Sequence, residues 1–170
     1  MEEFQFKIDY SNITHISAIA DFPNRKGFLY IFHANKIPPH IGWSVKDKFY
    51  SLKATGVDIG LDTAKINHII LKKQIPTLIV SLTDTVIKNN ITDQVFSSYG
   101  KRLYAGKTCL NPIDEVLFSA VKHEKIGDLL KTLFDDKKKL KFYGVNLPKS
   151  FKGIYNYSKN EIEKRIIELQ

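Results

Sequence analysis

Two short strand patterns joined by a tight turn place the strongest constraint on the fold of this chain. Residues 40–45 alternate between apolar and small or polar side chains, and residues 48–52 give a second strand after the turn. Because the Pro38-Pro39 pair cannot donate hydrogen bonds to a β-ladder, we expect the first strand to begin at about His40. A rigid sheet would then hold the His40 imidazole at the start of a strand, where a substrate can reach it.

The rest of the chain mixes strand and helix patterns without a regular alternation. Strands are expected at residues 4–8, 27–34 and 76–82, and residues 142–147 are either a last strand or an extended loop. Helices are expected at residues 13–20, 62–73, 84–99, 109–121, 127–134 and from an Asn160 cap to the end. This order predicts an α+β fold in which an antiparallel sheet packs against helices. A length of 170 residues favours a single domain over residues 1–170.

The formal net charge of +8 is typical of proteins that bind nucleic acid or an anionic surface. The lysines are scattered, however, and a solvated loop explains the dense run at residues 137–141 beside Asp135 and Asp136. The sequence contains no helix-turn-helix, aromatic RNA-binding or zinc-finger pattern. Nucleic-acid binding is therefore a less favoured alternative.

Composition also limits the compartment and the cofactors. A single cysteine excludes an internal disulfide and a cysteine-rich zinc site, and no HExxH or CxxC pair is present, so we expect no metal or other cofactor. No apolar run approaches the roughly 18 residues that a transmembrane segment needs. The N-terminus is acidic and soon polar, unlike a signal peptide. These features together favour a reducing cytoplasm.

The only cysteine, Cys109, lies where a helical pattern begins. Pro112 fits the first turn of that helix, and free N–H groups at a helix start lower the pKa of a nearby thiol. A thiolate paired with an imidazole is the nucleophile arrangement of cysteine hydrolases, so His40 is the expected partner of Cys109. The alternative is that Cys109 is only a small buried hydrophobic side chain.

The motif His-Ile-Gly-Trp at residues 40–43, followed after a turn by Phe-Tyr-Ser-Leu at residues 49–52, resembles a signature of NlpC-like papain-fold hydrolases. In the ordinary form of that fold, the cysteine helix precedes the histidine strand. Here His40 comes first and Cys109 later, which resembles the circularly permuted branch. That branch includes lecithin-retinol-acyltransferase-like enzymes and bacterial permuted amidases or peptidases, and the similarity covers about residues 27–122.

The resemblance implies a permuted papain-like fold and a thiol-dependent reaction on an amide or ester bond. Cys109 would be the nucleophile, His40 the general base, and Ser51 the third residue, which orients the imidazole. The implied activity is that of a hydrolase or acyltransferase, such as a cysteine peptidase or amidase (a thiol protease), acting on a peptide, amide or lipid-ester substrate. Because serine orients an imidazole more weakly than histidine, glutamate or asparagine, a non-catalytic interaction module on the same fold is the second hypothesis.

Overall fold

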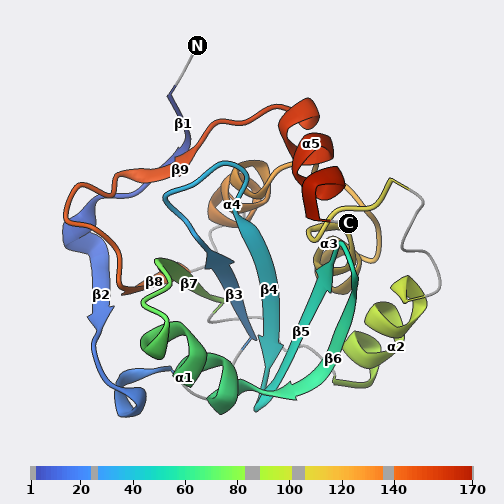
Figure 1. Cartoon of the computed structure of the whole chain (residues 1–170), viewed down its shortest axis with the longest axis horizontal. Coiled ribbons are helices and arrows are strands. Elements are labelled where there is room, and N and C mark those ends of the chain that lie inside the picture. Colours follow the sequence, from blue (N-terminus) through green and yellow to red (C-terminus); the bar gives the residue numbers. More distant parts are fainter. Residues whose placement is uncertain (1–2, 24–26, 83–88, 101–105, 136–139, 170) are drawn as a thin grey trace.

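A twisted, mainly antiparallel sheet organises the molecule (Figure 1). The computed structural model describes residues 3–23, 27–82, 89–100, 106–135 and 140–169. Within these ranges, seven strands lie side by side in the order β2 (Ile13–Ile16), β8 (Leu140–Val145), β7 (Thr77–Leu82), β3 (Gly27–Phe32), β4 (His40–Val45), β5 (Lys48–Lys53) and β6 (Gly56–Asp62). All neighbours are antiparallel except β2 and β8, which are parallel. A separate antiparallel pair joins β1 (Phe4–Lys7) to β9 (Gly153–Tyr155).

Helices cover both faces of the large sheet, which confirms the predicted α+β class. They are α1 (Thr63–Lys72), α2 (Asn89–Tyr99), α3 (Asn111–Phe118), α4 (Ile126–Asp135) and α5 (Lys159–Leu169), with short 3₁₀ turns η1 (Tyr10–Asn12) and η2 (Ile19–Asp21). The first helix begins as the sequence predicts, since the Asp62 side chain accepts a hydrogen bond from the Ala64 N–H at 2.9 Å.

Strand alternation divides the apolar side chains between two cores. On one face, side chains of β3 and β4 such as Leu29, Ile41 and Trp43 pack with α2, α3 and α4. On the other face, side chains such as Tyr30 and Phe49 pack with α1. The period of two that the sequence displays in this region therefore places alternate residues of each strand in different layers.

The helix predicted over residues 13–20 is wrong. Residues Ile13 and Ile16 belong to the edge strand β2, and the 3₁₀ turn η2 follows. Ile13 packs into one core and Ile16 into the other, so an edge strand with both faces covered imitates the spacing of a helix. The predicted helical residues 84–88 lie outside the described part of the chain.

Two helix ends also differ from the prediction. The helix that follows Cys109 stops at Phe118, because Ser119 adopts a left-handed conformation with φ of 59°. The last helix is capped by Ser158 rather than Asn160. The Glu161 N–H donates to Ser158 Oγ at 3.3 Å, and the Glu161 carboxylate accepts from the Ser158 N–H at 2.6 Å, which is a capping box.

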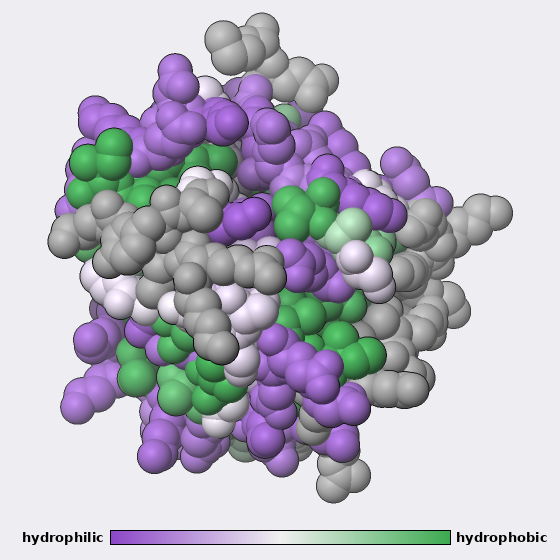
Figure 2. Space-filling model, turned by 90° about the vertical axis from the view of Figure 1, so that its right-hand side faces the viewer, coloured by the Kyte–Doolittle hydropathy of each residue, from purple (hydrophilic) through white to green (hydrophobic). Residues whose placement is uncertain are grey.

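The face at the right of Figure 1 carries mostly hydrophilic side chains, with separate apolar patches between them (Figure 2). Helix α5 has no buried residue, and its Ile167 is 72% exposed. This helix therefore lies on the surface of the molecule rather than in either core.

Candidate functional site

His40 is the first residue of β4, as the proline pair before it predicts. It is paired with Phe32 of β3, and the two rings stack with their centroids 5.7 Å apart. The imidazole is half-buried, so the sheet fixes its position while part of the ring stays accessible.

Gly42, two residues after the histidine, is required by packing. A Cβ atom at this position would overlap Cζ of the Phe49 ring, far inside the distance at which two non-bonded carbon atoms meet. The ring of Phe49 fills this space from β5, where it is buried and also packs edge-on against Phe32. The glycine of the His-x-Gly motif thus lets an aromatic side chain of the neighbouring strand pack against β4.

Cys109 lies in a turn that leads into α3 rather than in the helix itself. The turn is closed by a reciprocal pair of hydrogen bonds. Asn111 N–H donates to the Thr108 carbonyl at 3.1 Å, and Thr108 N–H donates to Asn111 Oδ1 at 2.7 Å. Pro112 follows in the first turn of α3. These contacts hold the thiol at a fixed place beside the start of the helix.

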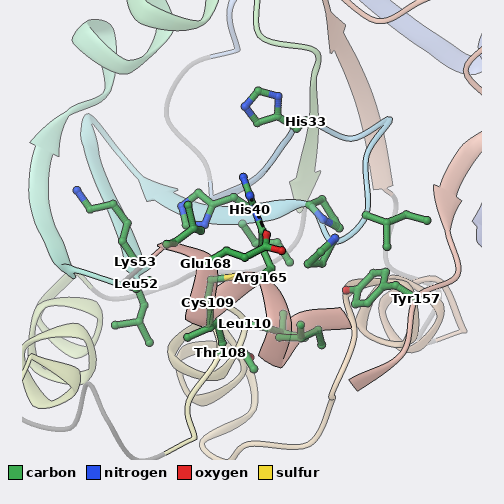
Figure 3. A pocket seen from close by; sticks show the side chains of 18 of the residues that line it. His33, His40, Leu52, Lys53, Thr108, Cys109, Leu110, Tyr157, Arg165 and Glu168 are labelled. Atoms are coloured by element: carbon green, nitrogen blue, oxygen red, sulfur yellow. Dashed lines mark hydrogen bonds and ion pairs between the residues drawn. The ribbon is translucent and has the colours of Figure 1, made fainter. Parts of the chain in front are cut away.

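The side chains of Cys109 and His40 line one cavity of about 700 Å³ (Figure 3). Its walls come from the segment before β4, the end of β5, the turn before α3, and α5. Apolar lining residues include Ile41, Leu52, Leu110, Tyr157, Ile162 and Ile166, and charged ones are Lys36, Lys53, Lys107, Glu124, Arg165 and Glu168. The fold thus brings to one cavity the two residues that the sequence analysis singled out for catalysis.

Burial controls the protonation states of the two groups. It raises the pKa of the Cys109 thiol to about 11, although hydrogen bonds from the backbone of Ile41 and of Cys109 itself act in the opposite direction. The expectation that the helix start lowers the pKa of this thiol is therefore wrong, because loss of solvent outweighs the nearby N–H groups. Burial also lowers the pKa of His40 to about 4.

At neutral pH the site therefore holds a thiol and a neutral imidazole rather than an ion pair. Among the described residues, no hydrogen bond joins the Cys109 sulfur to the His40 ring. A base is needed to ionise such a thiol.

Ser51, the predicted third residue, is buried on β5 and is not among the residues that line the cavity. Its hydroxyl donates to Asp58 Oδ2 at 2.8 Å, and Lys53 Nζ lies 2.8 Å from Asp58 Oδ1. The sequence analysis named neither Asp58 nor Lys53, because the pairing of β5 with β6 is what brings them to Ser51.

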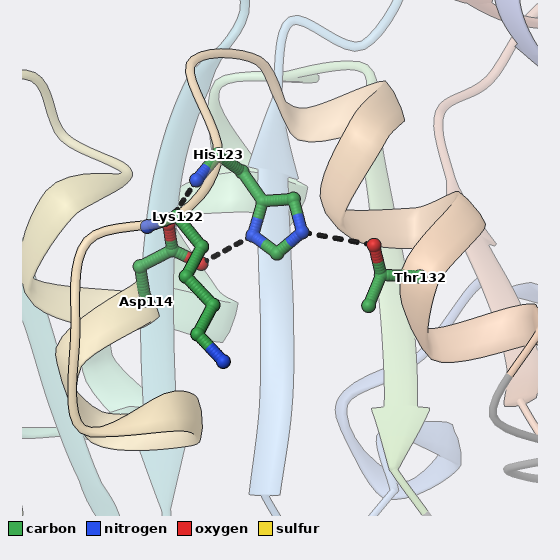
Figure 4. A network of polar contacts seen from close by, with 4 residues as sticks. All are labelled: Asp114, Lys122, His123 and Thr132. Atoms are coloured by element: carbon green, nitrogen blue, oxygen red, sulfur yellow. Dashed lines mark hydrogen bonds and ion pairs between the residues drawn. The ribbon is translucent and has the colours of Figure 1, made fainter.

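A second group of polar side chains connects α3 to α4 (Figure 4). The fully buried Asp114 accepts hydrogen bonds from the N–H groups of Lys122 and His123 at 2.7 and 2.6 Å, and from the His123 ring at 2.7 Å. The other ring nitrogen of His123 lies 2.9 Å from Thr132 Oγ1. With three donors on one carboxylate, this group fixes the loop between the two helices, and we assign it a structural role.

The described residues carry neither a metal-binding cluster nor a membrane-spanning helix. No cluster of three or more His, Cys, Asp or Glu side chains has the arrangement of a metal site in these ranges. No helix in the same ranges combines the length and the apolar character needed to cross a bilayer.

Comparisons of the chain with protein-family models, with curated proteins and with solved structures gave no match.

Proposed function

We propose that this chain is a cysteine-dependent hydrolase or acyltransferase with a permuted papain-like fold, in which Cys109 is the nucleophile and His40 the general base. The observation that supports this proposal is the cavity that both side chains line. Cys109 precedes α3 and His40 begins β4, so only the tertiary fold unites them. The strand that starts at a histidine and the helix that follows a cysteine are the two features that the resemblance requires.

The reaction starts from the neutral pair. As Cys109 Sγ attacks the carbonyl carbon of an amide or ester, a C–S bond forms and His40 takes the thiol proton. The negative charge that develops on the carbonyl oxygen needs a hydrogen-bond donor. The Cys109 backbone N–H, which lies beside its own sulfur, is one candidate.

The tetrahedral intermediate then collapses. The bond to the leaving amine or alcohol breaks, and the His40 imidazolium donates its proton to that group, which leaves a thioester on Cys109. In the second half, His40 takes a proton from water or from an acceptor alcohol or amine, whose attack releases the acyl group and restores the thiol. Water as the acceptor gives hydrolysis, and another nucleophile gives acyl transfer.

The cavity suits a substrate that has both apolar and charged parts. Its volume of about 700 Å³ is within the range of small-molecule sites. Ile162 and Ile166 of α5 form part of the apolar wall, and Arg165 of the same helix adds a positive charge. A peptide, an amide or a lipid ester would each meet these requirements.

A chemical trap tests the proposal. The full chain is incubated with p-nitrophenyl butyrate at neutral pH, and acylation is located by mass spectrometry of the intact protein and of its peptides. We expect one butyryl group on Cys109, which disappears with time as the thioester is hydrolysed, and none in Cys109→Ala. A wild-type chain that liberates nitrophenol no faster than Cys109→Ala would refute the proposal.

A non-catalytic module is the second candidate, and the unactivated state of the Cys109 thiol favours it. In that case the cavity binds a ligand and leaves it intact. This alternative predicts that Cys109→Ala retains ligand binding and that no acyl group ever appears on the wild-type chain. Binding to nucleic acid stays a prediction from the net charge of +8, to be tested by the salt dependence of affinity.

A further inference from the structure

We propose that Asp58 is a positioning residue for His40: a carboxylate, held by Ser51 and Lys53, that stabilises the imidazolium formed during the reaction. The inference deepens the proposed function, on which it rests. It gives the role of orienting the imidazole to Asp58 on β6, one strand beyond Ser51 on β5, which is the residue that the resemblance indicates.

Strand pairing puts Asp58 on the same face of the sheet as His40. Gly42 of β4 is paired with Ser51 of β5, and Ser51 is paired with Asp58 of β6. Directly paired residues project their side chains to the same face. His40 lies two residues before Gly42 on β4 and therefore shares that face.

The carboxylate of Asp58 leans back toward β4. Its two oxygens are bound by Ser51 Oγ and by Lys53 Nζ, both at 2.8 Å, and both partners belong to β5, the strand between β6 and β4. The Asp58 side chain is only 20% exposed, and Ser51 is buried. Two fixed contacts and limited exposure give this negative charge a defined position over β5, the strand next to β4.

The charge of Asp58 acts on His40 in the direction that a general base requires. Burial lowers the pKa of His40, and Asp58 is the first among the charges that act on it and the one that raises its pKa. Lys53 and His33 lower it. Because His40 becomes positively charged when it takes the thiol proton, a nearby carboxylate stabilises the state that follows proton transfer.

This arrangement explains how a serine, Ser51, can stand at the position where the resemblance places the residue that orients the imidazole. The Ser51 hydroxyl uses its proton in the hydrogen bond to Asp58, which leaves its oxygen as an acceptor only. A hydroxyl that donates to a carboxylate is a stronger acceptor than an isolated one, because successive hydrogen bonds polarise each other. Ser51 therefore fixes the carboxylate of Asp58, and Asp58 rather than Ser51 supplies the charge that acts on His40.

Other charged or titratable groups also border the cavity that His40 lines. They are Cys109 and Lys107 before α3, Lys36 and His33 before β4, Glu124 before α4, Tyr157 before α5, and Arg165 and Glu168 on α5. These groups are unchanged in the variants below, so differences between variants report on Asp58 and Lys53.

The test uses the full chain with Asp58→Asn, Lys53→Gln and the control Asp47→Asn, which removes the same charge from the exposed turn after β4. The His40 ring is assigned by comparison with His40→Gln, and its pKa is measured by NMR titration. We expect Asp58→Asn to lower the pKa of His40, Lys53→Gln to raise it, and Asp47→Asn to leave it unchanged. If the two substitutions acted only through structural damage, Asp58→Asn and Lys53→Gln would shift the pKa of His40 in the same direction.

The second readout is the rate of Cys109 acylation by p-nitrophenyl butyrate. Asp58→Asn should slow it about tenfold, the order expected for partial loss of base catalysis, and the control Asp47→Asn should not slow it. An unchanged His40 pKa in Asp58→Asn, or shifts of the same sign in both variants, would overturn the inference. If the wild-type chain is never acylated, the proposed function fails on its own, and the titrations still decide whether Asp58 acts on His40.

Discussion

The side chains of Cys109 and His40 line the same cavity, one from the turn before α3 and the other from the first residue of β4. The cavity keeps both groups uncharged at neutral pH, because burial raises the pKa of the thiol and lowers that of the imidazole. Any chemistry of the Cys109 thiol at this site therefore begins with loss of its proton.

Alkylation of Cys109 should be slow near neutral pH. A pKa raised from 9.0 to about 11 leaves roughly a hundredfold less thiolate than an ordinary thiol has at the same pH. The rate constant with iodoacetamide should rise about tenfold per pH unit up to pH 10, measured against N-acetylcysteine. A plateau reached below pH 8 would mean that the nearby N–H groups dominate over burial.

The buried state of His40 should make folding stability depend on pH. Its pKa falls from 6.5 in the unfolded chain to about 4 in the folded protein, so the unfolded chain binds more protons between these values. This contribution is present above pH 6.5 and is lost as the pH falls toward 4, by at most about 3 kcal/mol. Urea unfolding at pH 7 and pH 4.5 should reveal a smaller loss in His40→Gln than in the wild type. Equal losses in the two proteins would argue against burial of a neutral imidazole.

The glycine of the histidine motif can be tested by double substitution. Gly42→Ala should cost about 1–3 kcal/mol, because its methyl group would overlap the ring of Phe49. Combining it with Phe49→Leu should recover part of that loss, as measured by a double-mutant cycle in urea. The control is Gly56→Ala, where a Cβ atom meets nothing within 4 Å and the effect should stay within about 0.5 kcal/mol. Similar costs at both glycines would contradict the packing argument.

Asp114 should be important for stability rather than for chemistry. Asp114→Ala leaves two buried N–H groups and the His123 ring without their acceptor, so we expect a loss of about 3 kcal/mol or more in the free energy of unfolding. Asp135→Ala, at an exposed position of α4, should change it by less than about 0.5 kcal/mol. An Asp114→Ala protein as stable as the control would show that the network contributes little.

The elements around the site were predictable where a single period dominates. The alternation after Pro39 predicted that β4 begins at His40, and the apolar run at residues 76–82 predicted β7. Strand β9 was missed, because three residues are too few for a periodic signal and its partner β1 lies at the other end of the chain.

Within the site, motif and chain order identified His40 and Cys109, but not the charges that act on them. The pairing register of β5 and β6 shifts between Phe49 and Ser51, and this register sets Asp58 opposite Ser51. A slip of one residue would turn Asp58 to the other face, so only the folded sheet reveals its position. The raised pKa of the Cys109 thiol also depends on tertiary burial, which local helix signals do not report.

The most direct measurement of the central claim is the rate of Cys109 acylation by p-nitrophenyl butyrate at pH 7 in the wild type, His40→Gln and His68→Gln. His68 is exposed on α1 and controls for the loss of an imidazole elsewhere. If His40 is the base for Cys109, His40→Gln should lower the rate about a hundredfold, and His68→Gln should leave it unchanged. A His40→Gln protein that is acylated as fast as the wild type would contradict the account.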